Sequence, residues 1–181
     1  MNNLRINTIG IDVSIQEIQK SLYKYLSQRW DGKIEGYGRV YKNKNSEGDF
    51  IPEWYNSANK DYENVYYEDS KSAVFCFLVS DEDPTNNEFV FTSKVKCVFA
   101  VNLENILSSK ERVDLEAQRD VVQFLRDSNF NTFKITSIQK TIESVYAGYN
   151  IKEIQDSGNI QPLHVFSVNF DLQYYLTDKC N

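Results

Sequence analysis

The stretch from Leu163 to Leu176 constrains the fold most strongly, because its side chains alternate in character almost without interruption. One face carries His164, Phe166, Val168, Phe170, Leu172 and Tyr174, and the other carries Val165, Ser167, Asn169, Asp171, Gln173 and Tyr175. A period of two is typical of a β-strand, and this one is long for a globular protein. We expect one face to meet a core and the other to meet water or a partner chain.

An amphipathic helix is predicted near the N-terminus. Ser14 and Glu17 have the spacing of a capping box, which predicts that the helix begins at Ser14, and Asp31-Gly32 predicts its end near Trp30. Its apolar stripe is formed by Ile15, Ile18, Leu22 and Tyr25/Leu26. We interpret it as a surface helix that covers a sheet.

The remaining elements predict an α+β fold, with a mostly antiparallel sheet and helices packed on one face. Further strands are expected over 34–41, where two glycines indicate a bulge or a close backbone approach, and over 62–67, 73–79, 89–101 and 133–139. Helices are expected over 112–129 and 142–149, and polar loops over 42–61 and 150–161. In the second helix Ala117, Val121 and Phe124/Leu125 form the buried side, and Leu115 lies outside it. No repeat or composition shift divides the chain, so residues 1–181 are expected to form one domain.

Composition excludes several classes of protein. The chain is 41% hydrophobic and 14% aromatic, which argues against disorder. Its net charge of −6 argues against a general nucleic-acid binder or a membrane-surface protein. No apolar run approaches the length of a membrane span, and no signal peptide is evident. Three widely spaced cysteines favour a reducing compartment, with Cys76 and Cys97 as buried small apolar residues.

Little in the sequence indicates catalysis. His164 is the only histidine, and its place on an apolar strand face favours a hydrogen-bonded structural role over a nucleophilic pair with a cysteine such as Cys97 on a neighbouring strand. No phosphate loop, nucleophile elbow or zinc motif is present. We therefore expect no catalytic residue, no metal and no cofactor. The alternative is a soluble hydrolase-like α+β domain that uses Asp/Glu and a divalent metal. Acids that flank strands are Glu53, Asp61, Glu63, Glu68 and Asp69, and solubilising charge is the other interpretation of them.

Two loops carry residues that suit assembly. Phe50, Trp54 and Tyr55 lie in the predicted loop 42–61, where aromatic side chains are either tucked onto the core or offered to a partner. Asp81, Glu82 and Asp83 lie in the turn after the strand 73–79, and they are more typical of a solvated turn than of a metal site. A sheet with an open edge can also be completed by a neighbouring subunit. A cytosolic adaptor that binds one protein partner is a third interpretation.

Several stretches, taken in order, resemble the small head–tail connector and tail-terminator proteins of tailed bacteriophages, in particular those of crAss-like and related phages of Bacteroidetes. The resemblance covers most of the chain. It is carried by Ile15 to Tyr23, Gly36 to Asn43, Pro52 to Tyr55, Glu116 to Val121, Ile138 to Tyr146 and Gln161 to Phe170.

The resemblance implies a non-enzymatic virion protein of the neck or tail region, assembled in the host cytoplasm, with a tail-terminator-like α+β fold. Such proteins form a ring, usually of six or twelve copies, that contacts portal, neck or tail proteins and continues the DNA channel. On this interpretation Phe50, Trp54 and Tyr55 are interface candidates. Asp81, Glu82 and Asp83 are candidates for a channel lining past which DNA slides without specific binding.

Overall fold

The computed structural model describes residues 1–31, 33–66, 71–85, 87–107, 113–128, 133–152, 154 and 162–176. These residues form one eight-stranded sheet in the order β4-β3-β2-β5-β6-β8-β7, with β1 paired to the start of β2. The strands are β1 (Asn2–Asn3), β2 (Glu35–Lys44), β3 (Phe50–Asn56), β4 (Asp61–Asn64), β5 (Ala73–Val79), β6 (Val90–Asn102), β7 (Phe133–Gln139) and β8 (Leu163–Tyr175). The helices are α1 (Ile11–Arg29), α2 (Leu103–Leu107), α3 (Asp114–Asp127) and α4 (Ile142–Val145).

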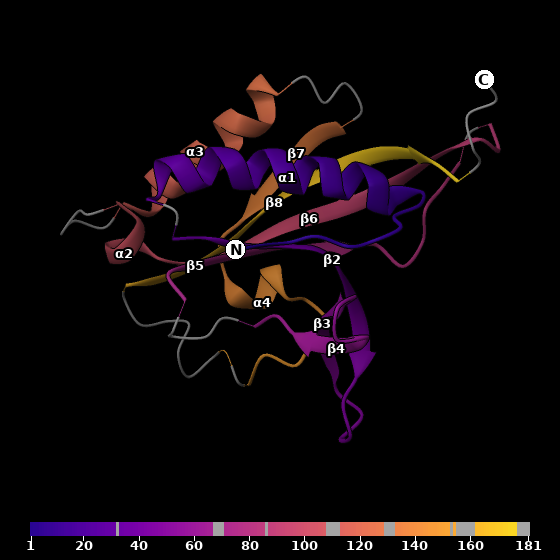
Figure 1. The fold of residues 1–181 in the computed structure, drawn as a ribbon, viewed down its shortest axis with the longest axis horizontal. Helices are drawn as coiled ribbons and strands as arrows, with labels where there is room; N and C mark the ends of the chain where they lie inside the picture. Colours follow the sequence, from indigo (N-terminus) through magenta and orange to yellow (C-terminus); the bar gives the residue numbers. More distant parts are fainter. Residues whose placement is uncertain are drawn as a thin grey trace.

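The sheet is mostly antiparallel, so the predicted α+β class is confirmed. The long strands β6 and β8 pair from Val90↔Tyr175 to Asn102↔Leu163, and β5 pairs with β6 in the antiparallel sense predicted for it. Only β1 and β5 run parallel to β2. The two long helices α1 and α3 lie together over one face of the sheet, and the short helix α4 lies on the other (Figure 1).

The first face of the sheet, under α1 and α3, carries the larger core. Its aromatic centre consists of stacked rings, with Phe75 5.7 Å from Phe99 and Phe99 4.9 Å from Phe166 between ring centroids. The stripe predicted for α1 is buried here, together with Ala117, Val121 and Leu125 of α3, while Leu115 is 66% exposed as expected. An ion pair also joins the helices, since Oδ1 of the buried Asp120 lies 2.7 Å from Nε of Arg29, whose side chain is 43% exposed.

The predicted start of the first helix is wrong. Helix α1 begins one turn earlier, at Ile11, and Ser14 lies inside it. Gly10 precedes the helix with φ of +55° and no side-chain cap is formed, so the Ser14–Glu17 spacing is not a capping box. The reason is burial, because Ile11 continues the apolar stripe into the core at 5% exposure, and glycine adopts the positive φ at low cost.

The predicted loop 42–61 is also wrong, because it forms a projecting sheet extension that we call the arm (residues 42–64). Strand β2 continues to Lys44, turns at residues 45–49 and returns as β3, which pairs in turn with β4. The arm extends away from the main sheet on the side of α4 (Figure 1). Polar side chains bond across these strands, for example Asn43 Nδ2 to Glu53 Oε2 at 2.8 Å, so apolar alternation did not mark them.

The glycines of β2 have the role expected of them. The pairing of β2 with β5 shifts register between Gly36 and Arg39. A Cβ atom on Gly36 would lie 2.6 Å from the Phe75 ring, which leaves no room for a side chain. The close backbone approach predicted from the sequence is thus confirmed.

Candidate functional site

The arm presents one of the three predicted aromatic residues to solvent. Phe50 is 37% exposed, with Lys42 Nζ 4.7 Å and Lys44 Nζ 5.3 Å from its ring centroid. Tyr55 is half-buried and packs edge-on against Tyr62, at 5.2 Å between ring centroids, and Tyr62 is itself 44% exposed. The arm therefore carries two separate exposed surfaces, a cationic and aromatic one of Lys42, Lys44 and Phe50 and, on the opposite face of its strands, an aromatic one of Tyr55 and Tyr62.

Trp54 is packed onto the core, the other role expected for an aromatic residue of the predicted loop. It is 4% exposed and packs in the core on the second face of the sheet, edge-on to Tyr37 at 5.5 Å between ring centroids. Trp54 is therefore a core residue of its own chain in this structure. This leaves Phe50 and Tyr55 as the interface candidates.

The three predicted acidic residues differ in their surroundings. Asp83 Oδ2 accepts a hydrogen bond from the Tyr174 hydroxyl at 2.8 Å, and Asp83 Oδ1 accepts one from Ser80 Oγ at 2.9 Å. Desolvation and this contact with Asp83 raise the pKa of Tyr174 to about 12. Glu82 is exposed, and the Asp81 side chain is 83% exposed with its Oδ2 3.9 Å from Lys42 Nζ. Asp81 and Glu82 are available to a partner, whereas Asp83 holds the turn in place.

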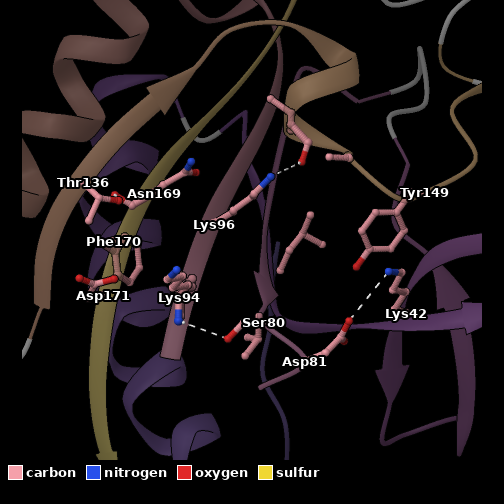
Figure 2. A pocket seen from close by; sticks show the side chains of 15 residues that line it. Lys42, Ser80, Asp81, Lys94, Lys96, Thr136, Tyr149, Asn169, Phe170 and Asp171 are labelled. Carbon is pink, nitrogen blue, oxygen red and sulfur yellow. Dashed lines mark hydrogen bonds and ion pairs between the residues drawn. The ribbon is translucent and has the colours of Figure 1, made fainter. Parts of the chain in front are cut away.

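A cavity of about 580 Å³ lies on the second face of the sheet, between the base of the arm, the acidic turn and the segment after α4. Its charged lining residues are Lys42, Asp81, Lys94, Lys96 and Asp171 (Figure 2). Leu78, Val145 and Tyr149 add an apolar wall. The cavity exists because α4 covers only one end of this face.

Lys96 connects the sheet to α4. Its Nζ donates to the backbone oxygens of Ser144, at 2.9 Å, and Val145, at 3.4 Å, which are carbonyls at the end of that helix. Desolvation lowers the pKa of Lys96. Burial raises the pKa of Tyr149, so its hydroxyl stays protonated, and it points toward Lys42 and Asp81 (Figure 2).

The predicted structural role of His164 is supported by its contacts. His164 is 6% exposed, hydrogen-bonds Gln118 at 3.0 Å between their Nε2 atoms and stacks on Phe166. A pair with Cys97 is not formed, because Val101 lies opposite His164 and Val168 lies opposite Cys97. Four residues of strand, or about 13 Å, separate the two positions.

Cys76 and Cys97 are fully buried, as predicted. Burial raises the pKa of Cys76 to about 12 and also raises that of Cys97, which suppresses the thiolate form that nucleophilic chemistry requires.

The strand-flanking acids do not form a cluster of metal ligands in the described part of the chain. Glu53 accepts a hydrogen bond from Asn43, and Glu63 accepts hydrogen bonds from Asn56 and Asn59. Glu68 and Asp69 lie outside the described residues. Within the described ranges no three His, Cys, Asp or Glu side chains are grouped so that they could hold a metal ion. Over the same ranges no helix is both long and apolar enough to cross a membrane.

Sequence reasoning missed the cavity and its lysines. The available signal was the polar alternation of Lys94 and Lys96 in β6, which matches that of Asn169 and Asp171 in β8. Such alternation is equally typical of a solvated strand face, and Tyr149 and Lys42 reach the cavity only through the fold. Comparison with protein-family models, curated proteins and solved structures finds no match to this chain.

Proposed function

We propose that this chain is a structural virion protein that forms a ring at the portal–tail junction of a tailed phage, where it joins head to tail and continues the DNA channel. The sequence resemblance motivates the proposal. The observation that supports it most directly is that the sheet has two open ends, β4 and β7, at opposite ends of one strand order in the described chain. Two different surfaces at opposite ends of a subunit are what a head-to-tail contact requires, and such a contact gives a ring when the rotation between subunits closes.

The edge strands β4 and β7 have features that limit unspecific pairing with strands of other molecules. Strand β4 has only four residues, and β7 carries Lys134 and a register shift between Ile135 and Ser137. Short edges, lysines and bulges discourage unspecific strand addition. We therefore expect the ring contact to be made by side chains rather than by extension of the sheet.

The arm supplies such side chains. Phe50 and Tyr62 are exposed apolar residues of β3 and β4, the strands of the arm that extend from the body of the subunit (Figure 1). Aromatic residues are enriched among those that dominate interface energetics. We propose that Phe50 on one face of the arm, and Tyr55 with Tyr62 beside it on the other, contact the neighbouring subunit or the next ring.

The experiment uses mass photometry to measure the fraction of subunits that assemble into rings on purified portal. It compares the Phe50→Glu and Leu115→Glu variants. Both wild-type side chains are exposed, but Leu115 lies on α3, away from the arm. Phe50→Glu should reduce the assembled fraction at least tenfold, whereas Leu115→Glu should leave it unchanged. Equal effects, or collars of purified particles that lack this chain, would contradict the proposal.

The channel hypothesis is tested separately by charge reversal. Asp81→Lys and Glu82→Lys are the informative variants. Asp83 is left unchanged because it accepts a hydrogen bond from Tyr174, and losing that bond would disturb the fold. A negative lining repels DNA phosphates, and a positive lining would hold them. The double variant should slow DNA ejection while rings still assemble, and unchanged ejection rates would count against a channel position for this turn.

A further inference from the structure

We propose that the cavity beside Lys94 and Lys96 binds a small organic anion, whose charged group lies between the two lysines and whose apolar part rests on Leu78, Val145 and Tyr149. The proposal does not rest on the ring contact, although the cavity shares Lys42 with the arm and Asp81 with the acidic turn. Its volume of about 580 Å³ lies in the range typical of small-molecule pockets. It also combines an apolar wall with a few convergent polar groups, as such pockets do.

The two lysines have donors to spare. Lys94 and Lys96 are two residues apart in β6 and so point to the same face, with Cα atoms about 7 Å apart. An ammonium group has three donors, and Lys96 uses two of them on the carbonyls of Ser144 and Val145. The Lys94 side chain is exposed and forms no ion pair or side-chain hydrogen bond with the described residues.

The charge of the lining favours an anion with one negative charge. Three lysines face two aspartates there, which leaves one positive charge in excess although the whole chain has a net charge of −6. Lys42 and Asp81 are paired with each other. Asp171 lies opposite Lys94 in one neighbouring strand and opposite Lys134 in the other.

The apolar wall argues for an organic ligand rather than a bare inorganic ion. Leu78 and Val145 belong to the core on the second face and continue it to the edge of the cavity. The Tyr149 hydroxyl, which burial keeps protonated, can donate to an acceptor atom of the ligand. A carboxylate or sulfonate with a ring or short chain satisfies both parts of the site.

The experiment titrates the whole chain with anilinonaphthalene sulfonate, an aromatic monoanion, by calorimetry. We expect saturable binding at one site per chain that weakens as salt is raised. Lys94→Gln should weaken it about tenfold. Lys134→Gln is the matched control, because Lys134 is an exposed lysine on the same sheet face, also opposite Asp171, and does not line the cavity. The uncharged analogue phenylnaphthylamine should bind more weakly and equally to all three proteins.

Lys96 provides a second variant because it has both a structural and a binding role. Lys96→Arg should keep most of the affinity, whereas Lys96→Gln should lose it together with some thermal stability. Absence of saturable binding, or equal affinities for wild type and Lys94→Gln, would overturn the proposal. Dye that binds isolated subunits but is released when the subunits assemble would also overturn the proposal. In that case the cavity would bind an acidic side chain of a neighbouring copy.

Discussion

The two faces of the sheet are closed in different ways. The first face is covered by two long helices, and its core extends along β5, β6 and β8. The second face is apolar where the four-residue helix α4 covers it, and it becomes polar where Lys94, Lys96 and Asp171 begin. The first face therefore contributes the larger core. The second face is left uncovered at one end, and the arm and the cavity lie there. The predictions below test this division.

The largest effect is expected on the first face. Phe99→Ala removes the middle ring of the stack Phe75–Phe99–Phe166 at a position with 0% exposure. Such truncations leave a cavity and cost about 3–5 kcal/mol. The free energy of unfolding in urea measures this loss. Leu115→Ala on the exposed side of α3 is the control, with an expected change within about 0.5 kcal/mol. Similar losses for both variants would mean that this core does not dominate stability.

On the second face, Trp54→Ala should destabilise the isolated subunit by about 3 kcal/mol, because the indole is buried against Tyr37. Trp54→Phe should cost less, because Trp54 Nε1 is buried without a hydrogen-bond partner among the described residues and its removal breaks no bond. Thermal unfolding of the monomer measures both variants. An unchanged melting temperature for Trp54→Ala, with weaker assembly, would return Trp54 to an interface role.

Alkaline pH should lower the free energy of unfolding, because each face of the sheet contains a buried thiol. The pKa of Cys76, on the second face, is raised from 9.0 to about 12, so the folded state keeps a proton that the unfolded state releases above pH 9. The stabilisation from this thiol is complete below pH 9 and is lost as pH rises toward 12, at about 1.4 kcal/mol per pH unit. Cys97 acts in the same direction on the first face.

Unfolding in urea with a reductant at pH 8, 9 and 10 tests this expectation. Cys76→Ala should be less stable than wild type at pH 8 and should show a shallower decline above pH 9. A slope that is the same in Cys76→Ala and wild type would show that the Cys76 thiol does not set the alkaline limit.

The smallest effect is expected at the open end of the second face. Asp81→Asn removes the contact with Lys42, but Asp81 is 83% exposed and the charged atoms are 3.9 Å apart. Exposed pairs of this kind contribute about 0–1 kcal/mol and are screened by salt. We expect a loss below about 0.5 kcal/mol that disappears in high salt. A larger loss would mean that the acidic turn stabilises the base of the arm.

Apolar runs and alternation located the strands of the main sheet. The strands 73–79 and 133–139 were predicted with the bounds observed for β5 and β7, and β8 differs from its prediction by one residue. Periodicity did not locate β3, because Asn43, Glu53 and Asn56 bond across the arm with polar groups. Backbone pairing does not require apolar side chains, so a strand of this kind has no signature in the sequence.

By itself the sequence determined the α+β class, the apolar faces of α1, α3 and β8 and the burial of both described cysteines, because a buried face must be apolar at the period of its element. Only the tertiary structure decided that Trp54 is a core residue, that Asp83 binds Tyr174 and that Lys42, Lys96 and Tyr149 line one cavity. These residues are far apart in the chain, and strand order rather than local pattern brings them together.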